Sequence, residues 1–264
     1  MGQAGRLGWV MAALAVLALA FLTVPILMVF PLSVDPSSFL RFPPTGFSLR
    51  WYEAFLTHRD WLDATWVSVQ VALGASVVAT LLGTAAAIGL TRDGVPGRAL
   101  VSLALVSPML LPAIVAAVAI YGIYTTFGLV GTKTGLVIAH AVLGLPFVIL
   151  NVQAALKGLP RGLEEASMSL GAHPVHTLFL VTLPLAWRGV AAGWVFSFVI
   201  SFDEVVIAMF LSSPSMTTLP KKMLDGVFFE LTPMLAAISA LLVIFNVALA
   251  LAGLALSRRR VAAA

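Results

Sequence analysis

Residues 157–188 read KGLPRGLEEASMSLGAHPVHTLFLVTLPLAWR and form a polar interruption between two long apolar runs. Apolar runs of that length are typical of membrane spans, so the stretch is expected to lie in water between two of them. Pro160 suits the first turn of a helix. Glu164 and Glu165 favour the positive end of the helix dipole, and Gly171 can stop the helix. The stretch therefore predicts an ordered helix and not a flexible linker.

A second short helix is expected to start at Pro174 and to close at Leu183-Pro184. In the first helix, apolar and small side chains recur at i, i+3, i+4 and i+7, a stripe suited to docking in a groove on a partner. The stripe consists of Leu163, Ala166, Ser167 and Leu170.

The same residues carry a resemblance to a known family. Glu165-Ala166-Ser167, then Gly171, then Val181-Thr182-Leu183-Pro184 match the spacing E-A-A, three residues, G, nine residues, I-x-L-P. This pattern resembles the EAA loop of permease subunits of bacterial ATP-binding-cassette (ABC) importers, with serine for the second alanine and valine for isoleucine. The resemblance implies a type I ABC importer permease fold and a coupling helix that fits a cleft in a cytoplasmic ATPase. An ordinary amphipathic loop is the alternative. The residues that the resemblance assigns to ATPase coupling are Glu164, Glu165, Ala166, Ser167, Gly171, Leu183 and Pro184.

The composition indicates a polytopic all-α membrane protein. The chain has 264 residues, of which 61% are hydrophobic and 10% charged, outside the range of soluble globular domains. The first apolar run is longer than a signal-peptide core and no small-x-small cleavage site follows it before Pro31, so it is expected to be retained. Six transmembrane helices fill residues 1–264 as a single permease domain and leave no room for a soluble domain. The expected spans are 7–33, 65–90, 99–124, 135–156, 189–211 and 232–256.

The positive charge is better explained by topology than by nucleic acid. The net charge is +4, and with the N-terminus inside, nine basic residues fall in cytoplasmic segments against six in outer ones. This distribution places both termini and the loop 157–188 in the cytoplasm. The resemblance implies that the membrane is the inner membrane of a bacterium. The nine are Arg6, Arg92, Arg98, Lys157, Arg161, Arg188, Arg258, Arg259 and Arg260, and the six are Arg41, Arg50, Arg59, Lys133, Lys221 and Lys222.

The outer segment 33–64 is expected to carry a helix over residues 47–56 (FSLRWYEAFL), lying flat where Trp and Tyr prefer the headgroup level. That phrase also resembles the spermidine/putrescine-type permeases. The second span is rich in Gly and Ala, which let helices approach closely and favour an interior position. Pro108, Pro112 and Pro146 predict kinks in the third and fourth spans.

Several chemical motifs fail on inspection. Gly131-Thr132-Lys133-Thr134 lacks the glycine before lysine and the preceding strand of a phosphate-binding loop. His173 and His176 have Pro174 between them and no further ligand residues nearby, which argues against a metal site. His140, within a span, is expected to be buried neutral or hydrogen-bonded to another helix. We find no catalytic constellation, cofactor site or metal site, and expect no enzyme.

Asp203-Glu204 is the second candidate site, because ionisable side chains inside a span normally face a cavity or a partner. In a fifth span starting near Gly189, residue 203 lies 14 positions along, which is about 21 Å and beyond the bilayer centre. Adjacent residues point about 100° apart, so at most one of the two faces the path squarely. The pair could line the substrate path, or could lock two membrane subunits together. The phrases that resemble the polyamine-type permeases are Ser201-Phe202-Asp203-Glu204-Val205-Val206, Met209-Phe210-Leu211 and Thr218-Leu219-Pro220.

These resemblances imply half of the path of an ATP-driven importer for a polyamine or a similar small cation. The implied partners are a second, related permease, two ATPases at the cytoplasmic face, an extracytoplasmic solute-binding protein and the lipid bilayer. An ABC permease for another small solute remains open. A self-contained secondary transporter or channel is opposed by the small size, by the lack of a convincing repeat and by the EAA spacing. An intramembrane enzyme is opposed by the missing catalytic residues.

Overall fold

The computed structural model describes residues 2–92, 96–160 and 162–258. These residues form helices joined by loops, with no strand among them beyond one isolated bridge between Ser213 and Met216, so the all-α expectation is confirmed. Two compact units result, one built from residues within 1–62 and 225–248, the other from residues within 63–224 and 249–264. Of the basic residues that support the topology, Arg161, Arg259 and Arg260 lie outside the described residues.

In the first unit, a buried aspartate organises the segment between α1 (Gly2–Ser33) and α2 (Arg50–Thr57). The Asp35 carboxylate accepts hydrogen bonds from the Thr45 hydroxyl at 2.6 Å and the Ser37 hydroxyl at 2.8 Å. The Thr45 bond is the main cause that lowers the pKa of Asp35 to about 2. The Trp51 indole donates to the Asp35 carbonyl at 3.0 Å. The expected aromatic helix therefore exists, and one of its aromatic side chains binds the preceding segment.

Four helical runs of the described chain are long and apolar enough to cross a bilayer. They are α1, α3 (Arg59–Thr91), α6 (Lys133–Lys157) and the run from Pro174 to Phe202. A fifth crossing results if one bent helix pair counts as a single span. Outside these runs, α11 (Leu219–Phe229) precedes α12 (Pro233–Arg258).

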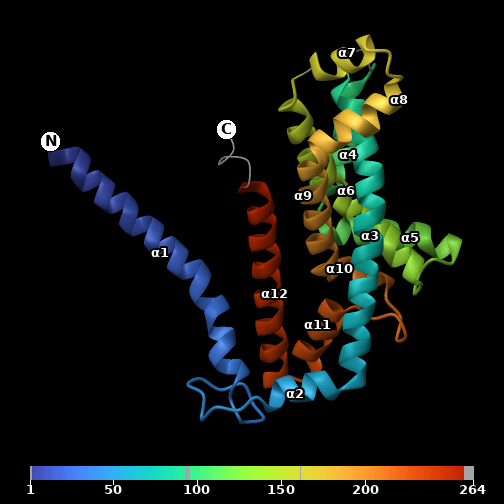
Figure 1. The fold of residues 1–264 in the computed structure, drawn as a ribbon. Helices are drawn as coiled ribbons and strands as arrows, with labels where there is room; N and C mark the ends of the chain where they lie inside the picture. The colour runs from blue at the N-terminus through green and yellow to red at the C-terminus, as the bar shows by residue number, and fades with distance from the viewer. Residues whose placement is uncertain (1, 93–95, 161, 259–264) are drawn as a thin grey trace. The chain divides into compact units, whose positions relative to one another are not determined.

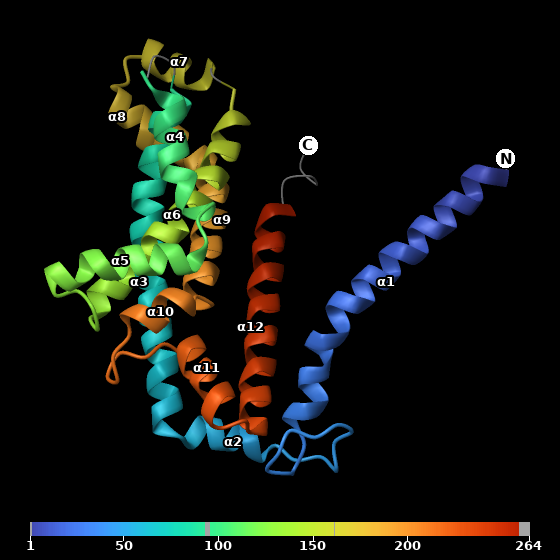
Figure 2. The same ribbon diagram turned by 180° about the vertical axis from the view of Figure 1, so that it is seen from behind.

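The third expected span, 99–124, is not one helix. It divides into α4 (Arg98–Val106), a 3-10 turn η1 (Ser107–Met109) and α5 (Ala113–Phe127), and the two parts are bent by 100°. Pro108 and Pro112 flank the bend, and proline neither donates a backbone N–H nor fits the interior of a helix. In Figures 1 and 2, α5 accordingly runs across α3 and α6. By contrast, α6 continues through Pro146.

The second short helix does not close at Leu183-Pro184 as the sequence predicted. α8 (Pro174–Thr177) continues through a π-helical turn, η2 (Leu178–Thr182), directly into α9 (Leu183–Phe202). Proline crowds the turn before it, and the wider π turn accommodates Pro184 without ending the helix. The end of the polar loop and the span that follows are therefore one helical run.

Close approach of α6 and α9 gives the second unit its core, and both views show the two helices side by side (Figures 1 and 2). A Cβ added at Gly144 would lie 2.1 Å from the Ser197 hydroxyl oxygen, and one at Gly193 would lie 2.9 Å from the Val148 Cα. On the other face of α6, Val148 packs with small α3 residues such as Ala79. The alanine-rich face of the second span is therefore buried as expected, whereas its opposite face, which carries Leu81 and Leu82, is exposed on this chain.

We predict that Gly193→Ala destabilises the protein by about 1–3 kcal/mol, because the new methyl group would meet the α6 backbone and force the helices apart. Gly89→Ala is the matched control. It replaces a helical glycine with nothing within 4 Å of the new Cβ, and should be neutral or slightly stabilising. Thermal unfolding of the purified protein in detergent measures both. Equal unfolding temperatures for the two variants would contradict the close approach.

Candidate functional site

The first helix that the sequence predicts in residues 157–188 is present as α7 (Gly162–Ser169), with Glu164 and Glu165 in its first turn. It ends in a Schellman motif. The Ala172 N–H donates to the Ser167 carbonyl and the Gly171 N–H to the Met168 carbonyl, while Gly171 has φ of +90°. The prediction that Gly171 stops this helix is confirmed, since a side chain at that φ would be strained.

Two side-chain hydrogen bonds, which we call the clasp, join α7 to the helical run that becomes α9. The Thr182 hydroxyl donates to the Glu164 carboxylate, and the Ser167 and Thr177 hydroxyls lie 3.0 Å apart. Thr177 and Thr182 are buried. Sequence analysis assigned no role to either threonine, because Thr177 belongs to no motif and Thr182 occupies the variable position of the pattern within the polar stretch 157–188.

The clasp corrects the predicted docking stripe on α7. Ser167 is half-buried and points to Thr177, so it does not belong to an outer docking surface. Leu163 lines a cavity and still has 43% of its surface exposed. Ala166 and Leu170 remain exposed, Leu170 with 90% of its surface. Helical periodicity placed the Ser167 side chain on the docking surface, but its hydrogen bond to Thr177 holds it against the α8–α9 run instead.

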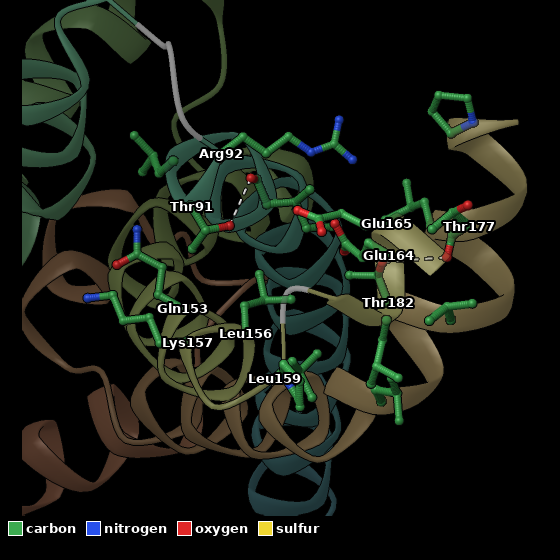
Figure 3. Close-up of a pocket in the computed structure, with 18 of the residues that line it drawn as sticks. Thr91, Arg92, Gln153, Leu156, Lys157, Leu159, Glu164, Glu165, Thr177 and Thr182 are labelled. Carbon is green, nitrogen blue, oxygen red and sulfur yellow. Dashed lines mark hydrogen bonds between the residues drawn. The ribbon is translucent and has the colours of Figure 1, made fainter. Parts of the chain in front are cut away.

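A cavity of about 880 Å³ is lined by α7, by the run from α8 to the start of α9, and by the adjoining ends of α3, α4 and α6. Figure 3 shows Arg92 and Lys157 at this cavity together with the two α7 carboxylates. Glu164 and Glu165 thus have open space on one side, while Glu164 is bonded to Thr182 on another. α7 is therefore fastened to the α8–α9 run and separated by the cavity from the remaining helix ends.

The acidic pair lies at a helix break, which corrects the fifth expected span, 189–211. α9 ends at Phe202, Asp203 forms its C-cap, and a separate helix α10 runs from Val206 to Leu211. The Glu204 carboxylate accepts the Ile207 N–H at 2.7 Å and so caps α10. Asp203 is exposed on this chain and Glu204 is half-buried. The estimate of 100° between the two side chains does not apply, because they are not on one continuous helix.

His140 lies fully buried in α6 and reaches the last turn of α9. Its Nδ1 is 3.0 Å from both the carbonyl oxygen and the hydroxyl oxygen of Ser201. The expectation of a hydrogen bond to another helix is confirmed. The sequence did not identify Ser201 as the partner, since 61 residues separate the two.

The phosphate-loop-like stretch 131–134 and the histidine pair 173/176 have structural roles at helix ends. Thr132 is the N-cap of α6 and accepts the Gly135 N–H at 3.0 Å, while Lys133 donates to Gln70. His173 is the N-cap of α8, with its Nδ1 accepting the Val175 N–H. Within the described ranges, no group of three or more His, Cys, Asp or Glu side chains is placed to hold a metal ion.

Helices long and apolar enough to cross a bilayer, joined by an ordered polar loop, are typical of a polytopic membrane protein. The family model for the inner membrane component of binding-protein-dependent transport systems matches residues 79–261. The chain belongs to that family. It is the permease subunit of an ABC importer and not an enzyme.

Two relatives bear on the substrate. The chain is 32% identical over 239 residues to the spermidine/putrescine transport system permease protein PotC of Escherichia coli (strain K12), covering 90% of each. It is 30% identical to the putrescine transport system permease protein PotI of the same strain, covering 86% of this chain and 83% of PotI. In fold it resembles a chain of a bacterial ABC transporter that imports the acidic polysaccharide alginate, with a TM-score of 0.67 at 17% identity, covering 92% and 93% of the two chains.

Proposed function

We propose that this subunit forms half of the path of an ATP-driven importer for a polyamine such as spermidine or putrescine. A second, related permease forms the other half, two ATPases bind the cytoplasmic face, and a solute-binding protein delivers the substrate from outside. The observation that carries the proposal is the acidic break between α9 and α10 in a chain whose relatives include polyamine permeases.

The helix geometry favours a cation at the break. The C-terminal end of a helix carries partial negative charge, and a carboxylate there adds to the negative potential that attracts a cation. Asp203 occupies this position on α9. An ammonium group crossing the membrane would be attracted to Asp203 and, beside it, to the partly buried Glu204.

The clasp supports a coupling role for residues 157–188. Because α7 is hydrogen-bonded to Thr177 and Thr182, and a cavity separates it from the ends of α3, α4 and α6, movement of α7 would pass first to α9. The far end of α9 is Asp203. ATPase closure against the exposed surface of Glu165, Ala166 and Leu170 would thus reach the acidic break through a single helix. Leu183 and Pro184 begin this helix.

Another small solute is the alternative substrate. The same fold occurs in the importer of alginate, an acidic polysaccharide, so the fold alone selects no cation. The carboxylate pair distinguishes the two, because a path for an anion gains nothing from Asp203 and Glu204. A role for the pair in locking the two permeases together is tested by the same variants.

The proposed topology has six spans: α1, α3, the bent pair α4–α5, α6, α9 with α10, and α12. Both termini and residues 157–188 lie in the cytoplasm, and the outer segment 33–64 places α2 at the outer interface.

We predict that a fluorescent reporter that matures only in the cytoplasm is bright when fused after Arg260 and dark when inserted after Ser215. A dark fusion at Arg260 would show that a span has been miscounted.

For the coupling loop, we predict that Gly171→Val uncouples the transporter. Gly171 has φ of +90°, where a side chain costs about 1–2 kcal/mol and a β-branched one more, so the end of α7 must rearrange. Uptake should fall about tenfold or more while the spans still insert. Gly162→Val is the matched control, since neither glycine has an atom within 4 Å of the added Cβ and only Gly171 has positive φ. Substrate-stimulated ATPase activity and uptake are measured together; equal behaviour of the two variants would remove α7 from the coupling role.

For the acidic break, we predict that Asp203→Asn or Glu204→Gln lowers spermidine uptake about 10-fold to 100-fold, the effect of losing a charge-assisted contact. Each variant removes charge with little change in volume. Uptake of radiolabelled spermidine is measured in vesicles, with assembly of the complex and its basal ATPase activity measured in parallel. Normal uptake by both variants would exclude an electrostatic role. Loss of assembly in both would favour subunit locking.

A further inference from the structure

The end of α9 is held from the side by a buried histidine of another helix. His140 on α6 has no exposed surface, and its Nδ1 lies 3.0 Å from the Ser201 carbonyl oxygen. Ser201 is the second-last residue of α9, two positions before Asp203. The contact therefore fixes the backbone from which the acidic pair emerges.

The chemistry of this hydrogen bond has one direction. A carbonyl oxygen can only accept, although the Ser201 hydroxyl at the same distance could also donate to Nδ1. Nε2 of His140 is buried with no partner among the described residues, so the tautomer with its proton on Nδ1 is the one that leaves no buried ring N–H unpaired. The final carbonyls of a helix have no partner in their own helix, and at a buried residue such as Ser201 water does not replace that partner. The Val199 carbonyl is taken by the Asp203 N–H, and His140 provides the donor that the Ser201 carbonyl needs.

The same stretch of α6 also holds the other side of the break. Leu136 and Ala139 of α6 pack in one buried cluster with Ile207 and Leu211 of α10. On its α9 face, α6 contacts the helix closely enough at Gly144 that a methyl group would meet the Ser197 side chain. α6 is therefore the common support of both helix ends, with packing on the α10 side and the His140 hydrogen bond on the α9 side.

We propose that His140 is a positioning residue that sets where the Asp203 and Glu204 side chains lie, through its hydrogen bond to the Ser201 carbonyl. The inference rests on the proposed path role of the acidic pair. Its content is narrower, because it concerns the position of those side chains and not their effect on the substrate. Loss of the donor would leave a carbonyl unpaired inside the membrane and free the end of α9 to rotate.

The chain offers a direct test of position because it contains no cysteine. A single cysteine at position 203 (Asp203→Cys) or 204 (Glu204→Cys) can be modified with a cationic, water-soluble thiol reagent in the whole complex with its ATPases and second permease. The modification rate of this subunit is followed by mass spectrometry. Two variants of His140 are compared in each background. His140→Leu keeps a branched side chain without a donor, and His140→Asn places an amide N–H on the atom that follows Cγ, as in histidine.

We predict that His140→Leu changes the modification rate at one or both positions by about fivefold or more, and that His140→Asn stays within about twofold. Ser197→Ala is the matched control at the same interface. Ser197 is one turn before Ser201, and its buried hydroxyl has no hydrogen-bond partner among the described residues. Its removal should leave the rate unchanged. A normal modification rate with His140→Asn but not with His140→Leu would show that the hydrogen bond, and not the volume of the side chain, sets the position of the acidic pair.

Unchanged rates with His140→Leu, or equal changes with leucine and asparagine, would overturn the positioning role. The outcome is distinguishable from failure of the proposed function. If His140→Leu changes the rates while Asp203→Asn and Glu204→Gln transport normally, His140 positions the pair and the path role alone fails. If neither cysteine reacts in the complex with His140 intact, the pair faces no water-filled path, and both proposals fall.

Discussion

The close approach of α6 and α9 is the constraint on which the rest of the second unit depends. Helices in lipid gain little from burying apolar surface against each other, so packing and polar contacts must hold them together. Gly144 and Gly193 remove the side chains that would separate the two backbones. Because the helices are this close, a side chain as short as that of His140 can reach the α9 backbone. A methyl group at Gly193 therefore acts on more than local packing.

Helix breaks within a membrane raise a second constraint, since freed backbone groups need partners. At the end of α9 the structure supplies them from two directions. His140 donates to the Ser201 carbonyl, and the Glu204 carboxylate accepts the Ile207 N–H at the start of α10. One of the two proposed path carboxylates is thus part of the scaffold as well. The break is stable because its polar groups are partnered, and this permits a charge to be exposed there.

One continuous helical run joins the proposed coupling loop to the proposed substrate path in this chain. The polar loop is not a free connection between two spans. Its second half continues through the π turn η2 directly into α9. The clasp then attaches α7 to that run at Thr177 and Thr182. A rigid body transmits displacement with little loss, whereas the cavity beside α7 leaves room for movement against the other helix ends. The geometry connects the surface proposed for the ATPase with the acidic break by packing and hydrogen bonds alone.

The sequence by itself determined the all-α class, the apolar runs, the coupling helix and its stop at Gly171, because these depend on composition and on local backbone preference. Only the tertiary structure decided where α9 breaks. Asp203 and Glu204 are flanked by apolar residues on both sides, so the hydropathy pattern predicts one continuous span through them. The tertiary structure also decided the partners of Thr182 and His140. Those hydrogen bonds join residues that are distant along the chain, and which pair meets is set by how closely the helices pack.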